Sequence, residues 1–307
     1  MRIAAAAYPL DWHDDWASYE EKMTAWVEGA ADAGATLLVF PEYGAMELAT
    51  LAGKRIAADQ ENSIVAVSEL LPDVDTLFKK LAAEHGVYIC APTAPVRRDQ
   101  GRPVNRARLI TPDGQIGFQD KLIMTRFERE VWDIAPGKDV VIFDTAIGKI
   151  GIITCYDAEF PLIARAMVEA GAEILLAPSC TEKLSGYWRV RIGAMARALE
   201  NQCVVAHSPM VGRAAWSTTV AAATGSAAIY GPPDLGFPET GVLDEGPMGE
   251  PGWAIADVGL ADIARVRREG RVLNSLHWKE QDARLATVQT VELSDGIPIA
   301  ALASSAG

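Results

Sequence analysis

Short apolar runs rich in β-branched residues alternate with helical patterns along most of this chain. A strand is predicted at residues 1–9, a helix at 15–33 and a second strand at 36–40. Two hairpins, at 105–119 and 140–154, interrupt the alternation. Because a β-α-β unit normally has parallel strands and a right-handed crossover, helices should cover the faces of the sheet. The pattern therefore predicts one α/β domain built on a large mixed sheet or on a pair of sheets.

The remaining elements follow from the same signals. Further strands are predicted at 87–91, 173–179, 203–207 and 253–258, and helices from Asn62 or Ser63 to about Glu84 and at 162–170, 188–201 and 262–269. Residues 181–187 and the Gly- and Pro-rich segment 231–251 are predicted to be loops. We expect one domain at residues 1–280 and a weakly patterned tail at 281–307, which either packs on a partner subunit or is loose.

One junction between a strand and a helix carries a cysteine. Residues 150–154 have the composition of a buried strand, and Pro161 suits the first turn of a helix that Gly171 ends. Cys155 therefore lies where a side chain reaches the end of a sheet and backbone N–H groups point at whatever it attacks. It is either a small buried side chain or a nucleophile, and a nucleophile needs a nearby base because the reference thiol pKa is about 8.5.

Two charged residues also follow apolar strands. Glu42 comes directly after the strand at 36–40, at the carboxyl end where open α/β sheets place their ligands. Lys121 follows the second arm of the hairpin at 105–119. Taken singly, Glu42 also fits an exposed loop and Lys121 a solvated surface. Together with Cys155, they form a combination of acid, cation and thiol for which a binding protein has no need.

Composition argues against several classes of function. The formal net charge of −13 argues against a nucleic-acid-binding protein, which would present a basic face. No apolar stretch approaches the roughly 20 residues of a membrane helix, and the first nine residues lack the apolar run of a signal peptide. The four cysteines and four histidines show no metal-ligand spacing, and few scattered cysteines suit a reducing compartment. These features predict a soluble cytoplasmic protein without a metal site.

The strand-end stretches resemble one known family. Val39–Glu42, Gln119–Leu122 and Gly151–Pro161, in this order, resemble the carbon–nitrogen hydrolase family, the nitrilase superfamily, with further support from 171–173, 197–202 and 225–229. The resemblance runs from the first strand to about residue 275. It implies a four-layer α-β-β-α sandwich that pairs through helices into an extended homodimer. It also implies a small amide, carbamoyl or nitrile substrate and no metal or cofactor.

The resemblance implies a role for each member of a Glu–Lys–Cys triad. Glu42 is the general base that takes the Cys155 proton, and burial or a neighbouring acid has to raise its pKa for this task. Cys155 attacks a carbonyl or nitrile carbon, while Lys121 and the backbone N–H of Tyr156 hold the oxyanion. Ammonia or an amine leaves, and water activated by Glu42 hydrolyses the thioester.

Family members often carry a second glutamate that positions the lysine and the substrate. Glu128 lies seven residues after Lys121, a spacing similar to that of some relatives. Glu130 is nearer to the turn at 132–137 and is the alternative. We predict that Glu128 has this role and that Glu130 is a surface residue.

Residues on or just after loops at strand ends are candidates for the substrate pocket. They are Tyr43, Tyr156, Ser179, Thr181, Tyr187, Trp188 and Arg189. Plain packing is the alternative for Tyr187, Trp188 and Arg189, and aromatic residues in particular are mostly core. Arg189 is a candidate partner for a substrate carboxylate through bidentate pairing. Asp157 is expected to have a structural role at the turn.

Other functions have less support. The serine-hydrolase pattern G-x-S-x-G, the dinucleotide pattern G-x-G-x-x-G and the P-loop are absent from the sequence. A protease-like dyad of Cys155 with His207 and a non-catalytic scaffold of the same fold are the alternatives. Within the family we favour an amidase or carbamoylase over a nitrilase, because the Cys-Tyr-Asp sequence resembles amidases. Transfer of the acyl group to an amine in place of water is a further alternative.

Overall fold

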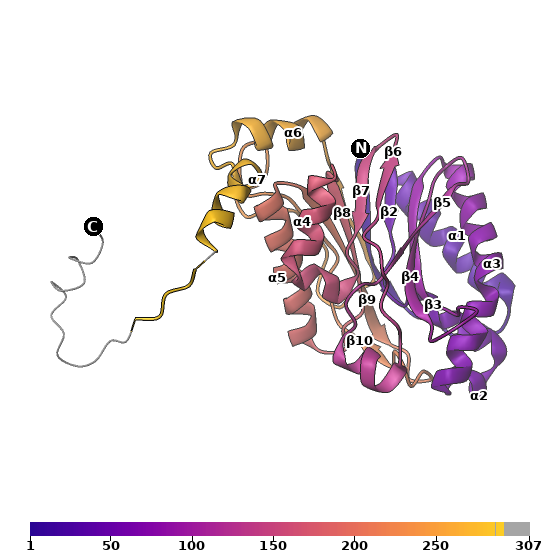
Figure 1. Cartoon of the computed structure of the whole chain (residues 1–307). Helices are drawn as coiled ribbons and strands as arrows, with labels where there is room; N and C mark the ends of the chain where they lie inside the picture. Colours follow the sequence, from indigo (N-terminus) through magenta and orange to yellow (C-terminus); the bar gives the residue numbers. More distant parts are fainter. Residues whose placement is uncertain (286, 292–307) are drawn as a thin grey trace, which may run out of the picture.

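The strands form two stacked layers that lie between two layers of helices (Figure 1). The computed structural model describes residues 1–285 and 287–291. The outer helices are α1 (Trp16–Asp32) and α3 (Gln60–His85) on one side, and α4 (Pro161–Glu169) and α5 (Leu184–Asn201) on the other. The predicted α/β class and the four-layer α-β-β-α arrangement are confirmed.

Each strand layer has a parallel centre and antiparallel edges. The first layer contains β1 (Arg2–Pro9), β2 (Leu37–Val39), β3 (Tyr88–Val96), β4 (Val104–Ile110), β5 (Ile116–Asp120) and β13 (Gly252–Asp257). The second contains β6 (Ile142–Thr145), β7 (Gly148–Ile152), β8 (Ile174–Ser179), β9 (Val204–Arg213), β10 (Ala222–Ala223), β11 (Ala228–Tyr230) and β12 (Val242–Glu245). The layers join where Tyr8 of β1 pairs with Met210 of β9.

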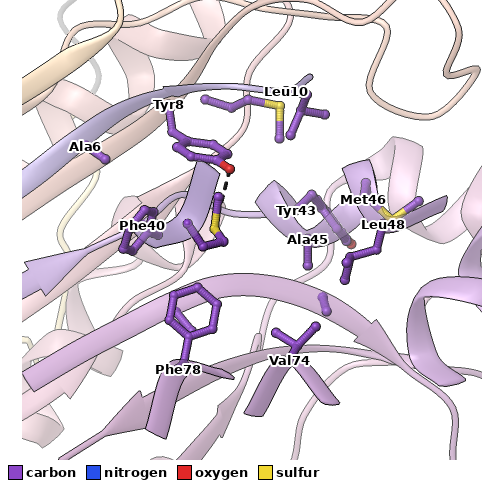
Figure 2. Close-up of a cluster of buried hydrophobic side chains, with 14 of the residues drawn as sticks. Ala6, Tyr8, Leu10, Phe40, Tyr43, Ala45, Met46, Leu48, Val74 and Phe78 are labelled. Atoms are coloured by element: carbon purple, nitrogen blue, oxygen red, sulfur yellow. Dashed lines mark hydrogen bonds between the residues drawn. The ribbon is translucent and has the colours of Figure 1, made fainter. Parts of the chain in front are cut away.

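Three buried cores separate the four layers. Because successive side chains of a strand point to opposite faces, β1 contributes to two of these cores. Ala6 and Tyr8 face α1 and α3, and Figure 2 shows Tyr8 with Phe40 and Phe78 in this first core, together with a dashed hydrogen bond from the Tyr8 hydroxyl to Met23 Sδ. The neighbouring residues of β1 face the other strand layer.

The second core lies between the two strand layers, and the third lies beneath α4 and α5. Ile3 and Ala5 meet Ile152 of β7 in the second core. The small side chains of β1 allow the layers to approach closely at this point. Met167 of α4 and Ala194 of α5 belong to the third core, which also includes Cys155. The cysteine thus lies at the inner face of these helices.

Shorter elements complete the described chain. They are η1 (Gly44–Ala52), α2 (Lys54–Ala57), η2 (Glu128–Trp132), η3 (Cys155–Glu159), α6 (Leu260–Glu269), α7 (Asn274–His277) and η4 (Trp278–Arg284). None of the helices within residues 1–285 and 287–291 combines the length and apolar character that crossing a membrane requires. Most of the predicted tail at 281–307 lies outside the described residues, so its packing and the boundary at 280 stay predictions.

Several predicted boundaries were wrong. The strands predicted at 87–91 and 203–207 extend further, as β3 to Val96 and as β9 to Arg213. Helix α3 begins at Gln60 and not after Asn62 or Ser63, because the Asp59 carboxylate caps it and accepts the N–H of Asn62 at 2.8 Å. The predicted loop at 181–187 already contains the first turn of α5, which begins at Leu184. The predicted loop at 231–251 contains β12, which pairs with β11.

Candidate active site

Cys155 lies at the turn between β7 and α4, as its sequence context predicts. The strand ends at Ile152, and Cys155 opens the short 3-10 helix η3 with a φ of 51°. This left-handed conformation is uncommon for a residue other than glycine, and strained backbone of this kind is concentrated at functional sites. The N–H of Tyr156 lies in the first turn of η3, where helical N–H groups have no partner within the helix.

Three charged side chains from separate elements meet beside this turn. Glu42 follows β2, Lys121 follows β5, and Glu128 begins η2. The Lys121 Nζ atom lies 2.7 Å from Glu42 Oε1 and 2.6 Å from Glu128 Oε2. Each of the three residues is at most 4 % exposed. The ammonium is therefore held between two carboxylates with little access to water.

Burial and mutual charge shift the pKa of each group in this cluster. Burial raises the pKa of Glu42, as does the nearby charge of Glu128, while Lys121 opposes the increase. Burial alone would lower the pKa of Lys121, but Glu42 and Glu128 raise it well above its usual value. Although burial also acts on Glu128, the charge of Lys121 holds the pKa of Glu128 below normal. The cluster thus contains a permanent cation beside a carboxylate of raised proton affinity.

The Cys155 thiol lies beside the Glu42 carboxylate. Glu42 Oε2 accepts the backbone N–H of Cys180 at 3.0 Å, and the carbonyl of the same Cys180 lies 3.9 Å from Cys155 Sγ. Burial raises the pKa of the thiol well above its usual value, and the charge of Glu42 raises it further. The resting thiol is therefore protonated, and its proton has a carboxylate of raised pKa beside it.

Polar side chains that the sequence analysis did not select hold the two carboxylates. Asn105 Nδ2 donates to Glu42 Oε1 at 2.9 Å, and Thr93 Oγ1 in turn donates to Asn105 at 2.6 Å. Thr125 donates to Glu128 Oε2 through both its N–H and its hydroxyl. No local signal distinguished Asn105, because its strand β4 also carries the polar residues Arg106 and Arg108. No local signal indicated Thr93, because its partner is in another strand.

The two candidates for the second glutamate, Glu128 and Glu130, have different surroundings in the structure. Glu128 contacts Lys121 and also accepts the Tyr43 hydroxyl at 2.8 Å. Glu130 instead pairs with Arg126 at 2.8 Å on the surface, with 56 % of its side chain exposed. Because η2 is a turn of π-helix, residues two positions apart leave it in different directions, and Glu128 is the one that points inward.

Asp157 joins the turn of the cysteine to the segment of the lysine. Its Oδ1 atom accepts the backbone N–H of Ile123 at 2.7 Å, and the N–H of Leu122 lies 3.1 Å from its Oδ2 atom. Burial raises the pKa of Asp157 to about 7, against the charge of Lys121 and these N–H groups. The predicted structural role thus extends beyond the turn to the neighbouring chain segment.

A cavity of about 540 Å³ opens onto Cys155 and the charged cluster. Four of the predicted lining residues line it: Tyr43, Tyr156, Thr181 and Arg189. Phe127 and Trp132 extend the aromatic wall, and Trp132 packs edge-on against Tyr43 with ring centroids 4.6 Å apart. Glu159, Glu182, Lys183 and Arg189 supply charged groups from the end of η3 and the start of α5. The cavity therefore has an aromatic side and a charged side.

Three predicted lining residues lie elsewhere. Ser179 is buried, and its hydroxyl forms a 2.9 Å hydrogen bond with His207 Nε2. Tyr187 is fully buried and stacks on His207, because α5 begins one turn earlier than predicted and directs this ring inward. Trp188, next to it on the helix, is 45 % exposed and does not line the cavity.

The protease-like dyad considered from the sequence does not match this arrangement. His207 is fully buried between Ser179 and Tyr187, and it is not among the residues that line the cavity of Cys155. Burial lowers its pKa to about 3. Within the part of the chain that the structure describes, no three His, Cys, Asp or Glu side chains are grouped so as to hold a metal ion.

Comparison with known proteins identifies relatives along almost the whole described chain. The family model described as "Carbon-nitrogen hydrolase" matches residues 2–268. The probable hydrolase YhcX of Bacillus subtilis is 33% identical over 272 residues, which cover 89% of this chain and 52% of that protein. The deaminated glutathione amidase of Yersinia enterocolitica is 29% identical, with 59% of this chain and 64% of that protein covered. The chain thus spans about half to two thirds of the length of these curated relatives.

Solved structures show the same fold at lower identity. A carbon-nitrogen hydrolase from Helicobacter pylori has a TM-score of 0.73 and 18% identity, and the match covers 94% of this chain and 98% of that one. A mutant of the amidase from Nesterenkonia sp. AN1, with acrylamide added to its active-site cysteine, has a TM-score of 0.65 and 22% identity, with 91% and 99% covered. At identities of 18% and 22%, these two structures show that the fold is shared and nothing beyond the fold.

Proposed function

This chain belongs to the carbon–nitrogen hydrolase family, and from that premise we propose that it hydrolyses the C–N bond of a small amide or N-carbamoyl compound. The observation that carries the proposal is the contact of Lys121 with both Glu42 and Glu128 beside Cys155, at the floor of a cavity. Burying three charges is costly, and a purely structural role would be served as well by apolar side chains. One relative, the deaminated glutathione amidase of Yersinia enterocolitica, is an amidase, which supports the proposal that the C–N bond is that of an amide.

In the first half of the proposed reaction, Glu42 takes the Cys155 proton as Sγ attacks the carbonyl carbon. Glu42 Oε1 already accepts two hydrogen bonds, from Lys121 and Asn105, whereas Oε2 accepts one from the N–H of Cys180, so Oε2 receives the proton. The new oxyanion lies between Lys121 Nζ and the N–H of Tyr156. The C–N bond then breaks, Glu42 returns the proton to the leaving nitrogen, and a thioester is left on Cys155.

In the second half, water replaces the released ammonia or amine. Glu42 takes a proton from this water as its oxygen attacks the thioester carbon, and the same two donors hold the oxyanion. The C–S bond breaks, the thiolate recovers the proton from Glu42, and the product is a carboxylic or carbamic acid. Removal of one oxyanion donor in such a site typically costs 10²–10³ in rate. Glu128 acts by positioning Lys121 and would not itself transfer a proton.

We also propose that the protein forms a homodimer through α4 and α5. Both helices carry large apolar side chains on their outer surface, and Leu162 is 73 % exposed and Ile192 62 % exposed. Leu184, Trp188 and Leu199 of α5 add to this surface. Exposed apolar side chains gathered on neighbouring elements favour association with another protein surface.

We also propose a cytoplasmic location. The four cysteines lie within the described residues and are free, as is usual for proteins of a reducing compartment.

The proposed function is tested with a panel of substrates and two probes of Cys155. Wild type, Cys155→Ala and the matched thiol-removal control Cys203→Ala are incubated with small amides, N-carbamoyl compounds and nitriles. Release of ammonia and consumption of each substrate are then measured. We expect turnover of an amide or N-carbamoyl compound by wild type and Cys203→Ala but not by Cys155→Ala. Consumption of nitriles alone would replace the amidase assignment with that of a nitrilase.

Alkylation provides a second measurement that does not depend on the panel. Iodoacetamide labelling followed by peptide mass spectrometry gives a rate for each thiol. Cys155 should react at least tenfold faster than Cys90 and Cys203, because it lines the cavity beside a base that takes its proton as Sγ attacks, whereas Cys90 and Cys203 are fully buried and do not line the cavity. Equal rates for all thiols, together with no turnover, would contradict the activated nucleophile and favour a scaffold.

A further inference from the structure

The charged side of the cavity contains the ion pair of Glu159 with Arg189. Glu159 ends η3, the same short helix that Cys155 begins, and Arg189 lies in the second turn of α5. Both residues line the cavity, and Arg189 Nε lies 3.4 Å from Glu159 Oε1. The Arg189 side chain is 61 % exposed and that of Glu159 22 %. A ligand entering the cavity therefore meets a carboxylate and a guanidinium together.

The ion pair with Glu159 changes which charged groups of a substrate Arg189 can bind favourably. A substrate that carries only a carboxylate would reach the guanidinium beside a second carboxylate, that of Glu159, and like charges at such a distance repel. A substrate that carries only an ammonium would meet Arg189 beside Glu159 in the same way. A group that carries both charges satisfies both residues at once, with its carboxylate on Arg189 and its ammonium on Glu159.

We propose that Glu159 and Arg189 form a subsite for a zwitterionic α-amino carboxylate, carried at the end of the substrate opposite to the amide. This inference rests on the proposed amide hydrolysis and names its substrate class. A 3-10 helix rises about 2 Å per residue, so the four steps of η3 separate the backbones of Cys155 and Glu159 by roughly 8 Å. This separation suits a substrate in which a short aliphatic chain joins the amide to the amino-acid group.

Four amides that share the four-carbon butanamide unit isolate each charge. L-glutamine carries both groups, glutaramate lacks the ammonium, 4-aminobutanamide lacks the carboxylate, and butanamide lacks both. For the wild type, kcat/KM for L-glutamine should exceed that for butanamide at least tenfold, and each singly charged amide should fall well below L-glutamine. Equal values for L-glutamine and butanamide would overturn the proposed subsite while leaving amide hydrolysis intact.

Substitutions test whether Glu159 binds the ammonium of the substrate and Arg189 its carboxylate. In Glu159→Gln, the ratio of kcat/KM for L-glutamine to that for glutaramate should fall at least tenfold, because only the former has an ammonium. In Arg189→Gln, the ratio of L-glutamine to 4-aminobutanamide should fall similarly, because only the former has a carboxylate. Glu269→Gln is the matched control, since Glu269 pairs with Arg265 at 3.5 Å on α6, outside the cavity. Ratios that do not change in the two cavity variants would show that the pair only joins η3 to α5.

Binding to Cys155→Ala decides the inference even if none of the four amides is hydrolysed. Isothermal titration calorimetry with the same four compounds measures affinity without chemistry. Preferential binding of L-glutamine, lost in Glu159→Gln and in Arg189→Gln on the same background, would support the subsite. Equal or undetectable binding of all four would overturn it. Failure of the proposed hydrolase function would appear separately, as absence of both turnover and rapid Cys155 alkylation.

Discussion

Asp157 holds the chain segment that follows the candidate oxyanion lysine, because the N–H of Leu122 lies 3.1 Å from its Oδ2 atom. Asp157 is two residues after Cys155, and Leu122 is directly after Lys121. The same carboxylate accepts the N–H of Ile123. The position of the nucleophile and that of the lysine are thus linked through a single buried side chain.

The stability of the wild type relative to Asp157→Asn should depend on pH. Burial raises the pKa of Asp157 from 3.8 to about 7, so the folded protein holds this proton more tightly than the unfolded chain does. The resulting stabilisation is complete below about pH 4 and is lost as the pH rises to 7, a change on the order of 4 kcal/mol. We expect the Tm of Asp157→Asn minus that of wild type to increase across this window in thermal unfolding experiments.

The exposed Asp144→Asn provides the control for this pH dependence. Its side chain is 77 % exposed, so the same measurement on this variant shows how the Tm difference changes with pH when no buried carboxylate is removed. A Tm difference for Asp157→Asn that changes no more than that of Asp144→Asn would show that the carboxylate of Asp157 has an ordinary pKa in the folded protein.

Glu128→Gln and Glu130→Gln should differ in activity. Glu128 contacts Lys121, whereas Glu130 pairs with exposed Arg126. Without the Glu128 charge, Lys121 loses one of two partners, and we expect kcat to fall by about 10² because an oxyanion donor is misplaced. Glu130→Gln should retain kcat within about twofold, since exposed pairs contribute little. Steady-state kinetics with the best substrate of the panel measures both values, and equal losses would place the functional glutamate elsewhere.

On the acidic side of the pH–rate profile, kcat/KM should fall at a pH higher than the pKa of an ordinary glutamate. Burial and the charge of Glu128 raise the pKa of Glu42, and the proposed base works only when ionised. Therefore kcat/KM should decrease as the pH falls through this raised value. In Glu128→Gln the negative neighbour is gone, so this decrease should move to lower pH. The apparent values belong to the coupled cluster, and a decrease that stays in place would argue against Glu42 as the base.

Two glycines in helices should respond oppositely to replacement by alanine. A Cβ atom at Gly193 of α5 would lie 2.6 Å from the carbonyl oxygen of Ala158, within η3. Because this neighbour is backbone, we expect Gly193→Ala to cost about 1–3 kcal/mol and to lower kcat by displacing the turn of Cys155. Gly29 of α1 has no atom within 4 Å of such a Cβ.

Gly29→Ala is accordingly the control for Gly193→Ala. It should stabilise the protein by about 0.5–1 kcal/mol, since alanine restricts the unfolded chain more than glycine does. Urea unfolding gives both free energies, and kcat is measured alongside. Loss of stability without loss of kcat in Gly193→Ala would separate the packing of α5 from the geometry of Cys155.

Local pattern was sufficient for the α/β class and for the approximate positions of the central strands. Apolar runs such as 150–154 and the helix that begins at Pro161 depend on neighbouring residues, so the sequence by itself determined them. It also indicated Glu42, Lys121 and Cys155, because a polar residue directly after an apolar strand lies at the edge of the sheet. The cap at Asp59 was missed because Asn62 and Ser63, within four positions of it, are also common N-cap residues.

The partners of these residues were decided only by the tertiary structure. Glu128 and Glu130 have similar local surroundings in the sequence, and the π-helical turn of η2 directs only the first toward Lys121. Asn105 is 63 positions from Glu42 in sequence, yet the two share a hydrogen bond because β4 and β2 lie in one sheet. Hydrogen bonds between elements far apart in sequence form only when packing of the cores has placed both ends, so no local pattern encodes them.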